Sequence, residues 1–461
     1  MLLKHLTGGF RPTRTFLLVC TSMGLTLGTA GMPASAGLTE AEIARLGQDL
    51  TPSGAEKAGN KEGTIPPWEG GQNKPLPGFD PAKGYIDPYA DDKPLLTITA
   101  ANMAEHKDKL APGQMEMLRR YPTYKIRVFP TRRSYAARPD VWTHAKAEAG
   151  QVELAAGGNG ILNLKRSQIP FPIPKNGLEV IWNHILRDLG GSAMRHSATL
   201  PVQTNGTFTP VTRTTKVLYN ASLEKPEPNR LLFFMDQLTG PSNVAGEALA
   251  VHEPIDQVKE TRLAWLYNPG ARRVVRAPDL AYDSPGIGTD GLRTNDDLNG
   301  FNGAPDRYNW KLVGKKEMYI GYNNYKLTSK SIKYSDFVKP AHLSPDYLRY
   351  ELHRVWVVEA TLKPGVRHIY AKRVFFIDED SWAIAHADQY DGRGDLWRVR
   401  EIFLTTAYDA PVTSGAAEVL YDLQARRYLA ESLTNQEKAG KFGLKLTPAD
   451  FSTDALRRAG Q

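Results

Sequence analysis

The chain of 461 residues is 41% hydrophobic and 23% charged, which is the composition of a globular protein and excludes a disordered or fibrous one. Its formal net charge of +8 comes from 58 Lys and Arg against 50 Asp and Glu, which are scattered rather than grouped in long runs. This distribution argues against a nucleic-acid-binding protein and against a protein that binds an anionic membrane by charge alone.

The first 36 residues have the three parts of an export signal. Three basic residues precede an apolar run over 16–27, and Ala34-Ser35-Ala36 satisfies the small-residue cleavage rule. The run is short and rich in Gly and Thr, which disfavours the alternative of an uncleaved membrane anchor. We therefore expect export and a mature chain that begins near Gly37.

The single cysteine, Cys20, lies inside this signal. It is preceded by Val19 and by a short apolar run, which fits no lipoprotein attachment site. An exported chain without the signal would contain no cysteine, which excludes disulfides, thiolate metal sites and a cysteine nucleophile. Its stability must then come from burial of a core.

Residues 37–98 differ in composition from the rest of the chain. The pattern over 38–47 predicts a short helix, with Thr39 as its N-cap and Gly47 at its end. The Pro- and Gly-rich run over 66–94 has neither a helical nor a strand period. It predicts an extended arm on the surface, with a simple tether as the alternative.

Residues 99–461 are predicted to form a single β-rich domain. Helices are expected over 100–109, 113–120, 139–149 and 177–189, with a strand over 124–129. Further strands are expected over 211–219, 230–236, 353–361, 368–377, 382–390 and 395–403. Short turns between consecutive strands indicate antiparallel neighbours, so the C-terminal part is predicted to be a meander. The tail after Glu431 is expected to be peripheral helix and loop.

A β-hairpin is predicted over 262–276, with its turn at Asn268-Pro269-Gly270-Ala271. The segment after the hairpin, 283–300, is long, polar and rich in glycine, and it has no period of its own. Loops of this length in a compact domain are usually functional lids or mobile segments. The sequence leaves open whether this loop gates a site.

Several short motifs, spread along the chain, together form a recognisable set. They are Gly63-Thr64-Ile65-Pro66-Pro67-Trp68, Phe234-Met235-Asp236, Gly246-Glu247-Ala248-Leu249, Asp283-Ser284-Pro285-Gly286 and the end from Trp356 to Arg400. This set resembles DUF1329, an exported bacterial family described as outer-membrane lipoprotein-sorting-like and without a settled biochemical role. The resemblance implies a place in the periplasm. By analogy it also implies an RND-type transporter or an outer-membrane protein as a partner.

A second resemblance covers only the hairpin and the loop after it. Its residues are Trp265, Tyr267-Asn268-Pro269, Arg272-Arg273-Val274, Gly288-Thr289-Asp290 and Asn295-Asp296-Asp297-Leu298. They are similar to a pattern of LolA/LolB-like lipoprotein carriers, with Thr289 in place of Ser and Asp296 in place of Glu. Such domains are half-open barrels that hold acyl chains under a helical lid. We therefore predict an α+β fold in which helices pack against a large curved antiparallel β-sheet, a LolA/LolB-like half-barrel.

The strand at 353–361 carries apolar side chains on both faces. Its second face is therefore either covered by helices or lines an apolar cavity. A cavity under a curved sheet suits a lipophilic ligand, since each buried methylene contributes about 0.8 kcal/mol. The candidate cavity residues are Trp265, Tyr267, Trp356 and Phe376, with ordinary core aromatics as the alternative.

Two further sets of charged residues are candidates for contact with a ligand or partner. Arg272, Arg273 and Arg276 are suited to a headgroup phosphate or a partner's acids, and a solvated strand face is the alternative. The loop candidates are Asp290, Asp296 and Asp297, whose spacing matches no EF-hand calcium loop.

Catalysis, cofactors and metals are not indicated. The nine histidines outside the signal form no His-x-x-x-His or His-Glu-x-x-His motif, and glycine-serine elbows and phosphate-binding loops are missing. His386-x-Asp388 is weak support for a metal site. Asp378-Glu379-Asp380 is interpreted as a hairpin turn.

The sequence thus predicts a periplasmic, non-enzymatic carrier or binding protein for a lipid, a lipoprotein acyl chain or another apolar compound. The alternatives are a scaffold or assembly protein of the outer envelope and a hydrolase of envelope lipid or glycan. A continuous apolar cavity would favour the carrier, and a solid core would favour the scaffold. Two close carboxylates in a cleft, with a raised pKa, would favour the hydrolase.

Overall fold

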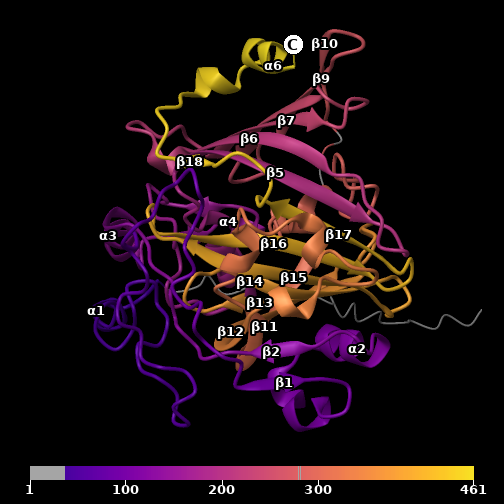
Figure 1. Ribbon diagram of the computed structural model, residues 1–461. Coiled ribbons are helices and arrows are strands. Elements are labelled where there is room, and N and C mark those ends of the chain that lie inside the picture. The colour runs from indigo at the N-terminus through magenta and orange to yellow at the C-terminus, as the bar shows by residue number, and fades with distance from the viewer. Residues whose placement is uncertain (1–36, 279, 281, 461) are drawn as a thin grey trace, which may run out of the picture. The chain divides into compact units, whose positions relative to one another are not determined.

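The computed structural model describes residues 37–278, 280 and 282–460, so the expected export signal lies outside the described residues (Figure 1). The chain from Gly37 onward clusters as one unit. Its helices are α1 Glu40–Ala44, α2 Pro112–Arg120, α3 Pro139–Glu148, α4 Gly177–Leu186, α5 Tyr334–Phe337 and α6 Thr453–Ala459. Over the described ranges, none of these has the length and apolar content needed to cross a bilayer.

A 16-stranded sheet is built mainly from two antiparallel meanders (Figure 1). The first contains β5 Ser192–Val202, β6 Val211–Tyr219, β7 Arg230–Gly240, β8 Ala248–Pro254, β9 Leu263–Asn268 and β10 Arg273–Arg276. The second contains β12 Tyr350–Leu362, β13 Lys372–Asp378, β14 Ile384–Tyr390, β15 Leu396–Ala407, β16 Val412–Asp422 and β17 Arg427–Leu433. Pairing of β17 with β5 joins the two meanders into one surface.

Short strands and one long one complete the sheet. β11 Tyr308–Gly321 lies antiparallel to β12, and β18 Lys441–Phe442 pairs with β5. β1 Leu96–Ile98 pairs with β2 Ile126–Val128. β2 contacts β12 in the parallel sense through Val128 and Tyr350, which makes the sheet mixed. A separate small pair is formed by β3 Glu153–Leu154 and β4 Ile161–Leu162.

The predicted α+β class with a large, mostly antiparallel sheet is confirmed, and the sheet is not closed. The predicted C-terminal meander corresponds to β12–β17, and the strand predicted over 211–219 coincides with β6. Sequence reasoning missed β5, β8, β11, β16 and β17. The helix predicted over 100–109 is a 3₁₀ helix over Met103–Lys109.

Two local signals act as the sequence predicted. Thr39 and Glu42 form a capping box, in which the Glu42 backbone N–H donates to Thr39 Oγ1 at 3.3 Å. Helix α4 begins after Asn176, whose Oδ1 accepts from the backbone N–H of Glu179 at 3.0 Å. It packs against β11 and β12 and ends at Arg187. That end places the Arg187 side chain in the protein interior.

Core clusters pack against both faces of the second meander, except where side chains of β15–β17 face a cavity. Met117 and Leu118 of α2 belong to a buried cluster with Phe403 of β15. Val180 and Ile181 of α4 belong to another cluster, which includes Val355, Val358 and several residues of β13 and β14. The covered-face alternative therefore describes β12, which contains the strand predicted over 353–361.

The first meander is different, because the C-terminal segment covers one of its faces. Phe451 and Leu456 are fully buried there, against Phe233, Met235 and Tyr267. Figure 1 shows α6, in yellow, near β9 and β10, and α6 contacts both strands and β8. The opposite face of β6, β7 and β8 faces a cavity.

Candidate ligand-binding site

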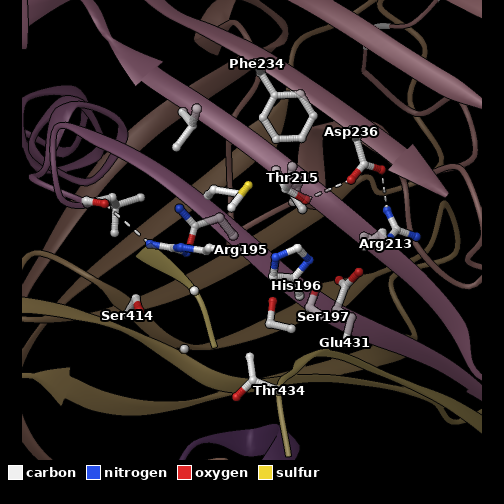
Figure 2. Close-up of a pocket in the computed structure, with 18 of the residues that line it drawn as sticks. Arg195, His196, Ser197, Arg213, Thr215, Phe234, Asp236, Ser414, Glu431 and Thr434 are labelled. Carbon is white, nitrogen blue, oxygen red and sulfur yellow. Dashed lines mark hydrogen bonds and ion pairs between the residues drawn. The ribbon is translucent and has the colours of Figure 1, made fainter. Parts of the chain in front are cut away.

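A cavity of about 620 Å³ lies between the uncovered face of β5–β8 and the facing strands β15–β17. Figure 2 shows Arg213, Phe234 and Asp236 on one side of this space and Ser414 and Glu431 on the other. Ligand pockets for small molecules span about 300–1,000 Å³, so this volume fits such a site.

The first wall contains an apolar row that follows from strand alternation, with Arg213, Thr215 and Asp236 further along the same strands. Val217 of β6 is paired with Phe234 of β7, and Phe234 is paired with Val251 of β8. All three line the cavity, as do Leu232 and Leu249. Their neighbours along each strand point the other way, into the cluster under the C-terminal segment.

The second wall is more polar, and other segments close the ends. The facing strands contribute Thr405, Ala407, Ser414, Ala416, Glu418 and Glu431. The arm, in which no helix or named strand forms over 66–94, contributes Phe79 and Tyr85. The segment that includes the loop contributes Ile287, Leu298 and Phe301. Segments that are distant in sequence thus meet around one space.

Ion pairs satisfy most of the carboxylates in the cavity wall. Arg213 pairs with Asp236 at 2.8 Å, Arg262 with Glu253 at 2.6 Å, and Arg293 with Glu431 at 3.0 Å. Glu418, opposite Glu431 in the sheet, pairs with Arg400 at 2.9 Å. These pairs fix the shape of the wall and neutralise its acids.

The predicted aromatic candidates lie outside this cavity. Trp265 and Tyr267 are on the covered face of the first meander, where Tyr267 packs against the C-terminal segment and is 3% exposed. Trp356 stacks on Trp382 with ring centroids 6.2 Å apart, and Phe376 is buried in the same cluster. Their contacts are those of core side chains, which was the alternative interpretation.

The predicted charged candidates separate into exposed and buried groups. The arginines of the hairpin are all exposed, namely Arg272, Arg273 and Arg276. Asp290 is also exposed and pairs with Arg427 at the start of β17. Asp296 and Asp297 are buried, and neither lines the cavity.

Asp296 and Asp297 instead anchor the end of the loop to β13. Asp296 accepts from Arg373 at 2.6 Å and from the ring of His368 at 3.0 Å, and Asp297 accepts from Tyr370 at 3.0 Å. Burial alone would raise the pKa of Asp296, but Arg373 and His368 hold it well below its ordinary value. The loop between 283 and 300 is therefore fixed at this end by charged hydrogen bonds.

One cluster of the described residues has the spacing of a metal site. His353, Asp378 and Asp380 are buried and offer ligand atoms within 4.8 Å of one another. Burial would lower the pKa of His353, but its contacts with Asp378 and Glu351 raise it to about 9. Asp380 is paired with Arg133 at 2.7 Å. The imidazolium and the guanidinium supply the positive charge that a metal ion would bring.

The motif Asp378-Glu379-Asp380 connects β13 to β14, as the turn interpretation required, although all three residues are buried. His386 and Asp388 contact each other at 2.8 Å inside the core. The cavity residues of β6–β8 were missed by sequence reasoning. The sequence signal that could have found them is the alternation along each strand, which puts Val217, Phe234 and Val251 on one face of the sheet and their chain neighbours on the other.

Comparison with known proteins gives one family. A family model described as "Protein of unknown function (DUF1329)" matches residues 97–457. An uncharacterized protein of Pseudomonas aeruginosa is 50% identical over 443 residues, which cover 95% of this chain and 97% of that protein.

Solved structures give weaker likenesses. A DUF1329 family protein of Desulfovibrio piger matches with a TM-score of 0.41 and 14% identity, over 58% of this chain and 92% of that one. A LolA superfamily protein of Nitrosomonas europaea matches with a TM-score of 0.37 and 12% identity, over 61% of this chain and all of that one. A candidate outer membrane lipoprotein-sorting domain of Vibrio parahaemolyticus matches with a TM-score of 0.43 and 17% identity, over 61% of this chain and 98% of that one.

Proposed function

This chain belongs to the DUF1329 family, as its motifs predicted, and since that family has no assigned function we propose one from the cavity: the protein binds a lipophilic molecule there and carries it within the periplasm. The ligand class is a lipid, an acyl chain or another apolar compound. Delivery to or from an RND-type transporter or an outer-membrane protein is part of the proposal. The expected export signal supports the periplasmic location.

The observation that carries the proposal is an apolar row on β6, β7 and β8 that no core side chain in the described part of the chain covers. Val217, Phe234 and Val251 form a cross-strand row whose side chains line open space instead of core. Burying acyl methylenes against such a wall contributes about 0.8 kcal/mol each, so a chain of ten or so carbons could be held without directional chemistry. A solid interior, as the scaffold alternative required, is not what this face of the sheet has.

The hydrolase alternative has one observation in its favour. Glu418 and Glu431 face each other across β16 and β17 and line the cavity, and burial together with Glu431 raises the pKa of Glu418. Arg400 holds Glu418 through Oε2 and Arg293 holds Glu431 through Oε2, and these guanidinium groups stabilise the ionised carboxylates and oppose a role as proton donor. Binding without turnover is therefore the function that this geometry supports best.

The test begins with the ligand. Residues 37–461, produced by export and purified, are extracted with organic solvent, and the extract is analysed by mass spectrometry. A stoichiometric lipid or other apolar compound supports the carrier. An empty extract that stays empty after incubation with total envelope lipids counts against it.

Binding is then measured with the neutral fluorescent probe N-phenyl-1-naphthylamine. Val217→Trp and Leu249→Trp fill the cavity, so each should raise the Kd of the probe at least about tenfold, a loss of about 1.4 kcal/mol. Val275→Trp is the matched control, because Val275 is 52% exposed on the edge strand β10. If the Kd of the probe is the same in both cavity variants and in the control, the probe does not bind in the cavity.

The hydrolase alternative is tested on the same preparation. Wild type and Glu418→Gln are assayed for release of p-nitrophenol from acyl esters of short and long chain length. Turnover that disappears in Glu418→Gln would favour the enzyme. Unchanged background hydrolysis, with probe binding retained, is the result expected for a carrier.

A further inference from the structure

Arg187 is a buried guanidinium whose hydrogen-bond acceptors are all uncharged. It lies at the end of α4, is 4% exposed and lines the cavity. Its Nη1 donates to the backbone carbonyl of His184 at 2.6 Å, and its Nη2 donates to Asn299 Oδ1 at 2.7 Å. Its Nε–H has no acceptor within the part of the chain that the structure describes. Among the residues that the structure describes, Arg187 pairs with no carboxylate.

The surroundings compensate this charge only in part, through Tyr219 and Glu418. Burial and Arg187 together lower the pKa of His184 well below its ordinary value, so that imidazole is neutral. Glu418 lies in the same region, but Arg400 holds its Oε2 at 2.9 Å and the Ser432 hydroxyl contacts its Oε1 at 3.3 Å. A buried unpaired charge costs several kcal/mol unless something neutralises it.

A second cation that lacks a carboxylate partner within the described ranges lines the same cavity. Arg195 of β5 faces this cavity (Figure 2). It donates to the Leu189 carbonyl at 3.4 Å and lies over the Phe442 ring at 5.7 Å. Burial lowers the pKa of Arg187 to about 10; repulsion from Arg195 adds to that shift, and Tyr219 and Glu418 oppose it.

The charge balance around these arginines is positive. Of the acids that line the cavity here, Glu418 and Glu431 are matched by Arg400 and Arg293, and Asp409 accepts from the Tyr85 hydroxyl at 2.8 Å. Arg187 and Arg195 outnumber this one unmatched acid. Lys330, Lys438 and Lys441 also line the cavity.

We propose that Arg187 and Arg195 bind the oxyanion of an amphipathic ligand, a carboxylate or a phosphate, whose apolar chain lies against Val217, Phe234 and Val251. This inference rests on the proposed function and names the ligand class within it. A guanidinium is suited to the task because its planar N–H donors match the oxygens of either group. In the apolar cavity such a pair is stronger than at an exposed surface.

The experiment compares matched anionic and neutral competitors for displacement of N-phenyl-1-naphthylamine. Oleic acid is compared with methyl oleate, and 1-oleoyl lysophosphatidic acid with monoolein. In wild type, each anion should displace the probe at a concentration at least about tenfold below that of its neutral partner. The pair with the larger ratio identifies carboxylate or phosphate as the preferred headgroup.

The variants are Arg187→Met and Arg195→Met, with Arg272→Met, at the exposed hairpin, as the matched control. Either cavity variant should reduce the anion preference to about twofold or less while the probe itself still binds. The control should keep the wild-type ratio. Equal competition by anions and neutral partners in wild type overturns the inference, as does a full preference in both cavity variants.

Two other results have a different meaning: failure of the probe to bind and failure of a variant to fold. Failure of wild type to bind the neutral probe would refute the proposed function itself and not only the choice of headgroup. Circular dichroism establishes whether Arg187→Met folds. If it does not, the half-buried Arg195→Met decides: loss of the preference supports the inference, and retention overturns it.

Discussion

Arg293 and Glu431 form a buried ion pair, with Nε and Oε2 3.0 Å apart and each side chain 5% exposed. The pair connects the loop over 283–300 to β17, in the wall of the cavity. Arg400 lies 3.8 Å from the other Glu431 oxygen, so the carboxylate is held from two sides. The loop is thus fastened to the sheet by charge at its middle as well as at Asp296.

Removing one partner of this pair should be costly. Arg293→Met leaves the Glu431 carboxylate buried with only the more distant Arg400, so the free energy of unfolding should fall by about 3 kcal/mol. The measurement is urea unfolding followed by tryptophan fluorescence. Arg427→Met, which breaks the more exposed pair with Asp290, is the control and should cost about 1 kcal/mol or less. Equal losses in the two variants would contradict the role of burial.

The stability of the protein should fall between about pH 6.5 and 9. The reason is His353, whose contacts with Asp378 and Glu351 raise its pKa from 6.5 to about 9, against the effect of burial. A raised pKa contributes stability that is fully present below 6.5 and is lost as the pH rises through 9, on the order of 3 kcal/mol. Urea unfolding at pH 6, 7.5 and 9 measures this loss. His353→Gln should have a flatter profile over the same interval, and an unchanged slope would show that other groups cause it.

Trp356 offers a test of the aromatic candidates. Its ring stacks on Trp382, and Lys315 Nζ lies 4.7 Å from its centroid, so Trp356→Ala should lower the free energy of unfolding by about 3 kcal/mol. It should leave the Kd of N-phenyl-1-naphthylamine within about twofold of wild type, because the residue lies outside the cavity. A tenfold weaker Kd in a folded variant would restore Trp356 as a ligand contact.

The C-terminal segment should contribute to stability through Phe451. This fully buried side chain packs against Phe233, so Phe451→Ala should cost about 3–5 kcal/mol. Val275→Ala, at an exposed position of β10, should change stability by about 0.5 kcal/mol or less. Thermal unfolding followed by circular dichroism compares the two. A small loss in Phe451→Ala would mean that the segment is only loosely attached.

Local chemistry made much of the fold predictable. The strand over 211–219 is bounded by turn residues and coincides with β6, and the capping box at Thr39 and Glu42 starts α1 as expected. Such signals depend only on neighbouring residues. β8 was missed because Ala248–Pro254 alternates small and large apolar residues and ends in a polar stretch, which weakens the strand pattern.

The cavity could not be located in the same way. Strands β6–β9 carry apolar side chains on both faces, and no local pattern tells which face stays open. Phe451 and Leu456, about 200 residues away in the sequence, decide it by covering the face of Trp265 and Tyr267. Because that contact is long-range, sequence reasoning selected aromatic candidates on the covered face.

The last prediction concerns gating by the loop over 283–300. Asp290, at its exposed tip, is paired with Arg427, and residues on both sides of it line the cavity. If the loop opens to admit a ligand, it must release this pair while the anchors at Asp296 and Arg293 hold. Joining positions 290 and 427 should then slow exchange without changing the fold.

The double variant Asp290→Cys with Arg427→Cys tests this in residues 37–461, which contain no other cysteine. Crosslinking with a short bismaleimide should slow dissociation of N-phenyl-1-naphthylamine at least about tenfold, since closure of the tip blocks exit. The same variant treated with a monofunctional maleimide is the control for the chemical modification. Unfolding free energy in urea should differ little between the two. An unchanged dissociation rate after complete crosslinking would mean that the ligand leaves by another route, such as the end of the cavity at Phe79 and Tyr85.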